Sequence, residues 1–355
     1  MDAGHGDGFG GSGNGRSGGV VKPGRIDGHN SPYRSGSHAI KSRVKDELIH
    51  IFREHAHKGA RKDKVVGSKT VDKRVKDIKS FFSDLFKLHY KIESVHSLKQ
   101  KHLVAVFHFL EEQGQSASTL QNKISMMRLF CEWIGKPGMV GDAREYVRDP
   151  LSVTRTMVVQ EDKSWEGNGI DAMEKIDLIR LEDERAAGVL LLCRGFGLRK
   201  KEALMMNIFK SIDGNNLMVV YGTKGGRARS VPIEHDWQWA LLEDVKGLVD
   251  QTTGRLMRRG YTVEQSIRRV NYMLEKHGLV LAKAGVSAHG LRHQYMQECF
   301  KEQTGVDAPI KGGDIATLDK KELDEVTGRL MERAGHSRLT IGSSYYGSRR
   351  RKKAS

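Results

Sequence analysis

The sequence predicts a mostly helical α+β protein with two domains, of which only the second contains a sheet. Three observations lead to this prediction. The chain has 355 residues, which is enough for two domains that each bury a core. Residues 38–135 carry apolar residues with a helical period. In the second half, two short runs typical of strands flank a glycine-containing turn, and helical patterns surround them.

Residues 1–37 are expected to form a flexible tail. They are rich in glycine, serine, asparagine and aspartate and show no hydrophobic period, so burial cannot offset the entropy of ordering them. His5, His29 and His38 lie in or beside this segment without the spacing of metal ligands. We therefore interpret them as solvated histidines.

Four helices are expected in the domain at 38–135, which makes it a small bundle. The first repeats an apolar residue every four positions, at Ile40, Val44, Leu48 and Phe52. The second, with Thr70 as its candidate N-cap, has apolar residues at Val71, Val75, Ile78, Phe82 and Leu85. The third ends at Gly114. The fourth opens with Ser118 and Gln121, spaced as a capping box, and ends at Gly135.

Residues 136–170 are the expected linker, because they contain prolines, glycines and an acidic cluster with little periodicity. A second domain is expected over 171–348. Its strands are predicted at 217–221 and 229–233, joined by the turn TKGGRA. Its helices are predicted at 171–187, 188–208, 235–250, 262–276, 289–302 and 319–334. Residues 349–355, RRRKKAS, form an expected basic tail.

The formal net charge of +16 is typical of a protein that works on a polyanion. Ribosomal, membrane-surface and merely soluble proteins can be equally basic, so charge alone leaves these classes open. Cys131, Cys193 and Cys299 are few and far apart, each in an apolar stretch, which indicates a reducing compartment. The chain opens without an apolar signal core and contains no apolar run long enough to span a bilayer. We therefore expect a cytoplasmic protein without a membrane partner.

Six polar residues in the second half carry the candidate chemistry: Arg199, Lys224, His289, Arg292, His336 and Tyr345. Attack on a phosphodiester builds negative charge on the non-bridging oxygens, which planar guanidinium groups bind in bidentate fashion. A histidine transfers protons near neutral pH. A tyrosine phenol, with a pKa of about 10, becomes a nucleophile only where cations or a base stabilise the phenolate.

Each of these residues also has an ordinary interpretation. Arg199 could be a surface arginine paired with Glu202, and Lys224 a solvated turn lysine. His289 could cap a helix, and Tyr345 could be a half-buried packing residue. Because the adjacent Tyr346 is equally a tyrosine, it remains the fallback nucleophile.

The ordered set, with its neighbours, resembles the tyrosine recombinases of the phage-integrase family. The resembling fragments are GLRKKEAL, YGTKGGRARSVPI, SAHGLRHQY and AGHS, with Tyr345 nine residues after His336. The resemblance covers about 38–348 and implies a SAM-like helical core-binding domain followed by a catalytic domain. It implies site-specific cleavage and rejoining of DNA through a 3′-phosphotyrosyl intermediate, with no metal and no cofactor. The six residues named above would be catalytic, with Lys224 protonating the departing 5′ oxygen.

The resemblance also implies partners. These are double-stranded DNA with a specific recombination site, further copies of the chain as a dimer per site and a tetramer in synapsis, and an accessory DNA-bending or directionality protein. Integration or excision of a mobile genetic element, at the nucleoid, is the expected role. Expected DNA-binding residues are Lys73, Lys76, Lys123, Arg128, Arg227 and Arg229. The first four are equally typical of solvated helix surface, and the last two, on the hairpin, are expected to clamp the DNA backbone.

Two other interpretations share the fold, and two features depart from the family pattern. A type IB topoisomerase uses similar chemistry, and an idle DNA-binding protein would keep the fold without it. Residues around 303–320 form an apparent insertion, which we expect to be a surface excursion. The basic end after Tyr345 is expected to be too short to pass a helix to a neighbouring protomer.

Overall fold

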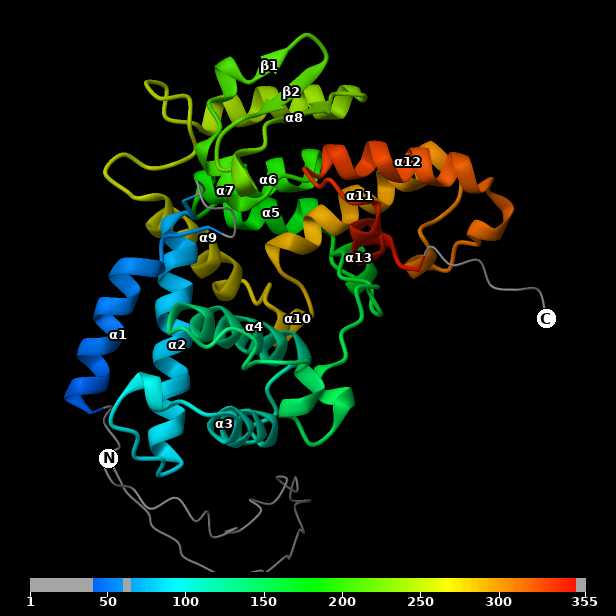
Figure 1. Ribbon diagram of the computed structural model, residues 1–355. Coiled ribbons are helices and arrows are strands. Elements are labelled where there is room, and N and C mark those ends of the chain that lie inside the picture. The colour runs from blue at the N-terminus through cyan, green and yellow to red at the C-terminus, as the bar shows by residue number, and fades with distance from the viewer. Residues whose placement is uncertain (1–40, 60–64, 349–355) are drawn as a thin grey trace, which may run out of the picture. The chain divides into compact units, whose positions relative to one another are not determined.

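A computed structural model of the chain describes residues 41–59 and 65–348 (Figure 1). It divides into two compact units, one up to Arg155 and one from Thr156. The expected tail at 1–37 and the expected basic tail at 349–355 lie outside the described residues, as do His38 and Ile40.

The first unit contains the four expected helices: α1 (Ser42–His55), α2 (Ser68–Lys87), α3 (Gln100–Glu112) and α4 (Ala117–Trp133). Their apolar positions meet in one core, in which Phe82 and Phe107 are fully buried. Two expected caps are wrong. Gly67, not Thr70, precedes α2. Ser116, not Ser118, caps α4, and its hydroxyl accepts a hydrogen bond from the Thr119 amide at 3.3 Å.

The segment expected to be a linker, 136–170, has buried residues on both sides of an exposed stretch at 154–157. Tyr146 is fully buried in the core of the first unit, and its hydroxyl donates to the Met139 carbonyl at 3.1 Å. Trp165 is fully buried in the core of the second unit. The unit boundary therefore falls inside this segment. Hydrophobic periodicity missed the packing because these anchors are single residues in irregular backbone.

The second unit contains the expected strand pair and a third, shorter strand. β1 (Ile212–Asp213), β2 (Asn216–Val219) and β3 (Arg229–Pro232) form one antiparallel sheet in that order. Leu217 lies opposite Val231, and both side chains are buried. β1 is only two residues long, too short to give an alternating pattern. The sheet and the helices confirm the predicted α+β class.

The helices of the second unit match the expected ones closely toward the C-terminus. The structure contains α8 (Asp236–Leu248), α9 (Val263–Lys276), α10 (Leu281–Ala284), α11 (Ala288–Thr304), α12 (Lys320–Arg333) and α13 (Ser343–Tyr346). The two helices expected over 171–208 are three: α5 (Ala172–Arg180), α6 (Glu184–Phe196) and α7 (Lys200–Met205). Asp183 caps the start of α6, and Gly197, with φ of 58°, ends it.

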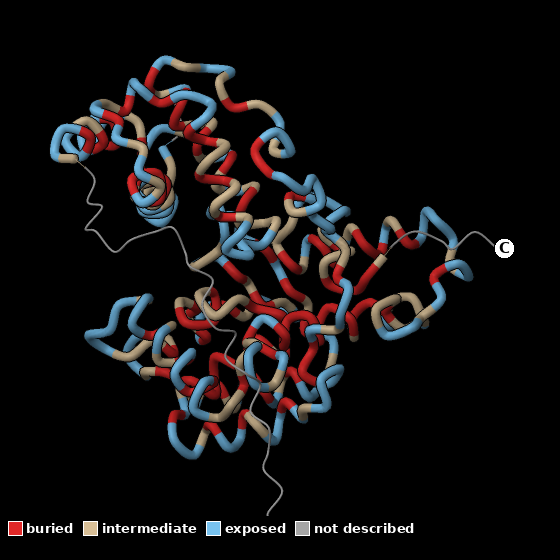
Figure 2. The backbone as a smooth tube through the Cα atoms, turned by 90° about the horizontal axis from the view of Figure 1, so that it is seen from below, coloured by how far each residue is buried: buried red, intermediate tan, exposed pale blue. Residues whose placement is uncertain are grey.

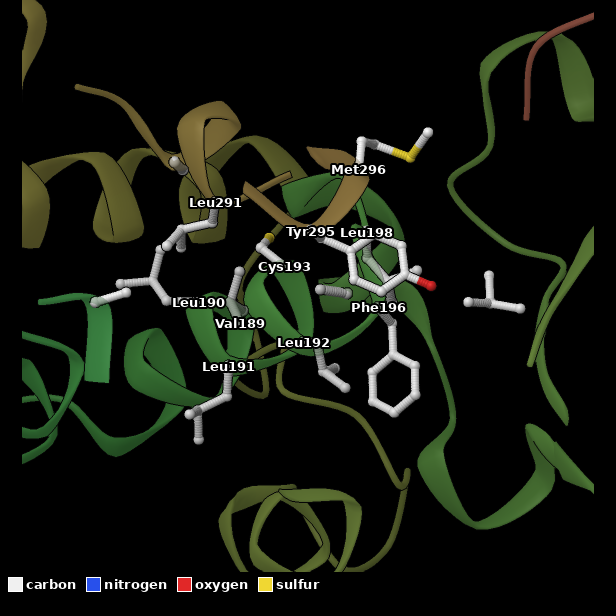
Figure 3. Close-up of a cluster of buried hydrophobic side chains, with 14 of the residues drawn as sticks. Val189, Leu190, Leu191, Leu192, Cys193, Phe196, Leu198, Leu291, Tyr295 and Met296 are labelled. Atoms are coloured by element: carbon white, nitrogen blue, oxygen red, sulfur yellow. The ribbon is translucent and has the colours of Figure 1, made fainter. Parts of the chain in front are cut away.

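Helix α6 is the centre of the second unit and contacts α5, α8 and α11 (Figure 1). Figure 3 shows Cys193 of α6 beside Leu291 and Tyr295 of α11, while Leu191 and Leu192 point to the opposite side of α6. In Figure 2 the buried residues gather where the elements of each unit face one another. The three cysteines are buried and free.

The apparent insertion around 303–320 is mostly exposed or partly buried, as expected of a surface excursion, but two of its residues anchor it to the core. Ala308 and Ile315 are buried in the main cluster of the second unit. Its first short turn, Pro309–Lys311, contacts α13. Across the described residues, no helix is long and apolar enough to cross a membrane.

Candidate active site

Turns that require glycine position the site residues. Arg199 precedes α7, directly after the Gly197 turn that ends α6. A Cβ on Gly197 would lie 2.5 Å from the Tyr295 ring, so glycine is required by space as well as by its φ. His336 follows Gly335, which has φ of 67° just after α12. The six candidate residues thus come from five separate places in the second unit.

Tyr345 is the centre of this arrangement. Its hydroxyl lies 3.0 Å from Arg292 Nε and 2.9 Å from His336 Nε2. Its ring is only 3% exposed, with the Arg292 guanidinium 5.5 Å from the ring centroid and the His289 ring 6.1 Å away. The structure therefore brings Arg292, His336 and His289 around one phenol.

Arg292 is fully buried and held by backbone carbonyls. Besides Tyr345, its guanidinium donates to the carbonyls of Gly197 and Ala334. Three of its five N–H groups are used in this way. The fixed guanidinium provides a preorganised positive charge beside the phenol.

Arg199 joins the same cluster from the side of α7. Its Nη2 donates to the Ala334 carbonyl at 3.1 Å and lies 3.5 Å from His336 Nε2. Its Nη1 donates to Glu202 at 2.6 Å. The ion pair with Glu202 exists, as the ordinary interpretation of Arg199 required, but the arginine also faces His336. The Arg199 side chain keeps 22% of its surface exposed, so it remains open to a ligand.

Arg229 does not lie on the surface, where we expected it to contact DNA. It is buried, and its Nη atoms donate to the two Glu202 oxygens at 2.9 and 2.8 Å. Its Nε donates to the Arg333 carbonyl at 2.6 Å. Arg229 therefore joins β3 to α7 and to the end of α12. The charge pattern could not reveal this, because Glu202 lies 27 positions away in the sequence.

The pKa values reflect these contacts. Burial would raise the pKa of Glu202, but its hydrogen bonds and ion pairs with Arg229 and Arg199 lower it to about 2. Loss of hydration, together with the charges of Arg292 and Arg199, lowers the pKa of His336 to about 4. At neutral pH the site thus contains a carboxylate between two arginines and an uncharged His336.

The two histidines of α11 lie beside Tyr345 at different depths. His289 is the exposed one, while His293 is buried with its ring 5.0 Å from the Tyr345 ring. Although part of His289 reaches solvent, its ring lies against His293 and Tyr345, and the loss of hydration there is the main cause that lowers its pKa, with His293 and Arg292 adding to the shift. Loss of hydration likewise lowers the pKa of His293 to about 4. Both rings are therefore available as uncharged hydrogen-bonding groups.

Lys224 and Arg227 lie apart from the phenol on the β2–β3 turn. Both are exposed, and Gly225 in the same turn has φ of 73°. The Lys224 charge contributes to the lowered pKa of His336, so the ammonium acts on the site at a distance. A ligand lying between the turn and Tyr345 would contact both the Lys224 ammonium and the Tyr345 phenol.

Tyr346 faces away from the cationic groups. It is fully buried, stacks on Phe300 with ring centroids 4.7 Å apart, and donates to the Thr327 hydroxyl at 3.0 Å. Burial raises its pKa to about 12. A Cβ on Gly342 would lie 2.1 Å from its hydroxyl, so the glycine makes room for it. Tyr346 is an anchor for α13, and the geometry favours Tyr345 as the reactive residue.

The expected DNA-binding residues of the first unit differ in how exposed their side chains are and in whether protein groups already bind them. Lys73 and Lys76 are exposed, although Lys73 also pairs with Asp77 at 2.5 Å. Lys123 donates to the Ser80 hydroxyl at 3.2 Å. Arg128 is partly buried, and its guanidinium donates to the carbonyls of Val140 and Gly141. Arg128 therefore holds the segment after α4, and the prediction of a DNA contact there conflicts with its geometry.

Sequence reasoning missed two groups that hold Tyr345, namely Gln297 and Asp162. Gln297 is buried on α11, five positions after Arg292, and its side-chain amide contacts the Tyr345 carbonyl. A polar residue on an otherwise buried helix face was the available signal. Among the described residues, no group of three or more His, Cys, Asp or Glu side chains could hold a metal ion.

Comparison with protein families gives two matches, one in each unit. Residues 56–140 match the N-terminal domain of phage integrases, and residues 168–298 match the integrase family. The chain belongs to the tyrosine recombinase family of phage integrases. The match over residues 168–298 includes four of the six candidate residues: Arg199, Lys224, His289 and Arg292. The other two, His336 and Tyr345, lie after its end.

Solved structures with the same fold include several DNA complexes. A lambda integrase dimer bound to a COC′ core site has 13% identity and a TM-score of 0.56, and the match covers 88% of this chain and 80% of that one. A lambda integrase tetramer bound to a Holliday junction has 15% identity and a TM-score of 0.54, covering 87% and 78%. The XerH site-specific recombinase on a palindromic difH substrate, in a post-cleavage complex, has 14% identity and a TM-score of 0.50, covering 86% of each chain. Comparison with curated proteins by sequence gives no significant match.

Proposed function

We propose that this integrase-family protein is a site-specific DNA recombinase that forms a covalent bond between Tyr345 and the 3′ phosphate of a cleaved strand. The observation that carries the proposal is the pair of contacts at the Tyr345 hydroxyl, 3.0 Å from Arg292 Nε and 2.9 Å from His336 Nε2. A packing tyrosine does not require a buried guanidinium and a neutral imidazole at its oxygen. A cation and a base beside the phenol are the groups that make a tyrosine nucleophilic.

The proposed chemistry begins with the phenol. At neutral pH His336 is uncharged, because its pKa is lowered to about 4, so its Nε2 can accept the Tyr345 proton. The phenolate oxygen attacks the scissile phosphorus, an O–P bond forms, and the bond from phosphorus to the 5′ oxygen breaks. Lys224 gives a proton to the departing oxygen. Attack by a 5′-hydroxyl of a partner strand reverses the steps, so the bond energy is retained without ATP.

The arginines stabilise the pentacoordinate phosphate that forms during the attack. Negative charge on its non-bridging oxygens would be met by Arg199, and the buried positive charge of Arg292 beside Tyr345 would add to this stabilisation. Arg199 is the more accessible of the two, with 22% of its side chain exposed. Both are held in place by carbonyls, so little reorganisation is needed when charge develops.

The proposed partners follow from the DNA complexes of the similar structures. Lambda integrase is described as a dimer on a core site and as a tetramer on a Holliday junction. We propose the same assemblies for this chain, with a dimer on each site and a tetramer in synapsis. We also propose integration or excision of a mobile genetic element at the nucleoid, assisted by an accessory DNA-bending or directionality protein.

Trapping of a covalent adduct tests the proposal. The DNA that the purified protein captures covalently would first be mapped, and its site then offered in a nicked form that releases the 5′-hydroxyl fragment. We expect an adduct that resists SDS and forms in EDTA. Tyr345→Phe should abolish it while DNA affinity is kept. Tyr346→Phe is the matched control and should still form it, because Tyr346 faces Thr327.

Intact supercoiled plasmids that carry the mapped site separate recombination from strand relaxation. A type IB topoisomerase would rejoin the strand that it cut, and it would relax supercoiled DNA without producing recombinants. The proposal expects recombinant products when two sites are supplied. An adduct that persists in Tyr345→Phe but is lost in Tyr346→Phe would show that the nucleophile is assigned wrongly.

A further inference from the structure

The main chain of Tyr345 is held by side chains and backbone outside the six candidate residues. Its carbonyl accepts a hydrogen bond from Gln297 Nε2 at 3.3 Å, and the same nitrogen donates to Asp162 at 2.9 Å. Two residues earlier, the Ser343 carbonyl accepts from the Val159 amide at 2.9 Å. Asp162 and Val159 both belong to residues 159–165, which we call the strap.

The strap is fixed along α11, the helix that carries His289 and Arg292. The Trp165 side chain is fully buried, and its Nε1 donates to the Ser287 carbonyl at 2.8 Å. A Cβ on Gly290 would lie 2.4 Å from the Lys163 carbonyl oxygen. Glycine in the HGLRH motif therefore lets the strap approach the helix, and the strap in turn lies against the turn that carries Tyr345.

Helix α13 needs such external support because it has only four residues, Ser343–Tyr346. A single helical turn is marginal by itself, since nucleation fixes several dihedral angles for one hydrogen bond. Tyr346 anchors one side through Thr327 and Phe300. The side that faces the arginines is held by Gln297 and the strap.

The orientation of the Gln297 amide follows from its neighbours. An ionised Asp162 carboxylate and the Tyr345 carbonyl are both acceptors, so the NH₂ group must face them. The Gln297 side chain is 2% exposed, and its Oε1 has no hydrogen-bond partner within the described structure. Asp162 therefore selects the amide orientation that donates to Tyr345.

We propose that Gln297 and Asp162 are positioning residues that hold Tyr345 for attack on DNA. This inference rests on the proposed function, because it concerns the same nucleophile. Gln297 acts on the Tyr345 backbone and touches neither its hydroxyl nor the phosphate. A displacement of about 1 Å at a reacting group can lower a rate by about 100-fold, so the loss of this support should slow cleavage without weakening binding.

The decisive variant is Gln297→Glu in the full chain. A glutamate at 297 meets two acceptors and can donate to Tyr345 only when it is protonated. At pH 8 and saturating nicked substrate, we expect the rate of adduct formation to fall by about 100-fold, with Kd within about twofold of the parent. The rate relative to the parent should rise in part as the pH falls to about 5.5, because the protonated carboxyl regains one of the two hydrogens that the amide donates to Asp162 and to the Tyr345 carbonyl. A structural defect alone would not create this pH dependence.

Matched controls separate positioning from misfolding. Gln294→Met changes a second buried glutamine of α11, which contacts Glu298 and not Tyr345, and it should leave the adduct rate and its pH profile unchanged. Asp162→Asn keeps an acceptor for Gln297 and should retain most of the rate. Asp162→Ala removes the acceptor and should lower the rate by about tenfold, at unchanged Kd.

The outcomes distinguish this inference from the proposed function. If the parent forms the adduct, Tyr345→Phe does not, and Gln297→Glu matches the parent at pH 8, the positioning role is overturned and the nucleophile stands. A rate loss shared equally by Asp162→Asn and Asp162→Ala would also overturn it. If Gln297→Glu does not fold, the two Asp162 variants decide the matter. If the parent forms no adduct, the proposed function itself is wrong.

Discussion

Replacing Glu202 by glutamine should destabilise the protein in a pH-dependent way. Glu202 is fully buried between Arg199 and Arg229, and the arginines lower its pKa from 4.5 to about 2. Each pH unit between the folded and unfolded pKa is worth about 1.4 kcal/mol, so these contacts stabilise the folded state by up to about 3 kcal/mol at neutral pH. Glu202→Gln should remove most of that.

The pH dependence follows from the direction of the shift. A lowered pKa in the folded state gives stability that is complete above the unfolded pKa and is lost as the pH falls toward the folded pKa. The difference in unfolding free energy between the parent and Glu202→Gln should therefore be constant from pH 8 to about 5. It should shrink by about 1.4 kcal/mol per pH unit below about 4.5.

Urea unfolding of both proteins at pH 7.0, 5.0, 4.0 and 3.5 measures this difference. Glu243→Gln is a suitable control, because Glu243 pairs on the surface with Lys246 and should change stability by less than about 1 kcal/mol. A Glu202→Gln deficit that stays the same between pH 7.0 and 3.5 would refute the reasoning. It would mean that glutamine disrupts packing and that the charge contributes little.

The other predictions concern cleavage and DNA binding. Arg199→Ala and Arg292→Ala should each slow adduct formation by about 100-fold or more, and an equal fall in affinity would recast them as simple binding residues. Lys224→Ala should regain much of its lost rate on a 5′-bridging phosphorothiolate, whose sulfur leaves without protonation; no recovery would remove Lys224 from the general-acid role. Arg227→Ala should lower the salt dependence of DNA binding by about one phosphate contact, measured as the slope of log Kd against log salt. Arg229→Ala should leave that slope unchanged because Arg229 is buried against Glu202, and an equal reduction by both would place Arg229 on the DNA.

Helix boundaries were predictable from the sequence where the apolar period was strong and the ends were marked. The predicted ranges 262–276 and 319–334 lie within one residue of α9 and α12 at each end. The range 136–170 was not predictable in the same way, because Tyr146 and Trp165 are isolated anchors in irregular backbone. Periodicity registers repeated burial and is insensitive to single buried side chains.

The candidate site was partly predictable because the order and spacing of its residues resemble those of the phage-integrase family. Arg199, Arg292, His336 and Tyr345 meet in the structure although they span the second unit. The partners of the charged residues could not be read from the sequence. Arg229 and Arg128 looked like surface charges, and only the fold shows that they bind Glu202 and backbone carbonyls. Gln297 was missed for the same reason, since its contacts lie in the strap and in α13.

The bond between Tyr345 and DNA is the central claim, and peptide mapping of the trapped adduct tests it most directly. Trypsin should release residues 339–349, LTIGSSYYGSR, which contain both candidate tyrosines. After nuclease digestion, we expect this peptide to carry one 3′-phosphonucleotide, and fragmentation should locate it on Tyr345. A nucleotide on Tyr346, or on a peptide from elsewhere in the chain, would contradict the account.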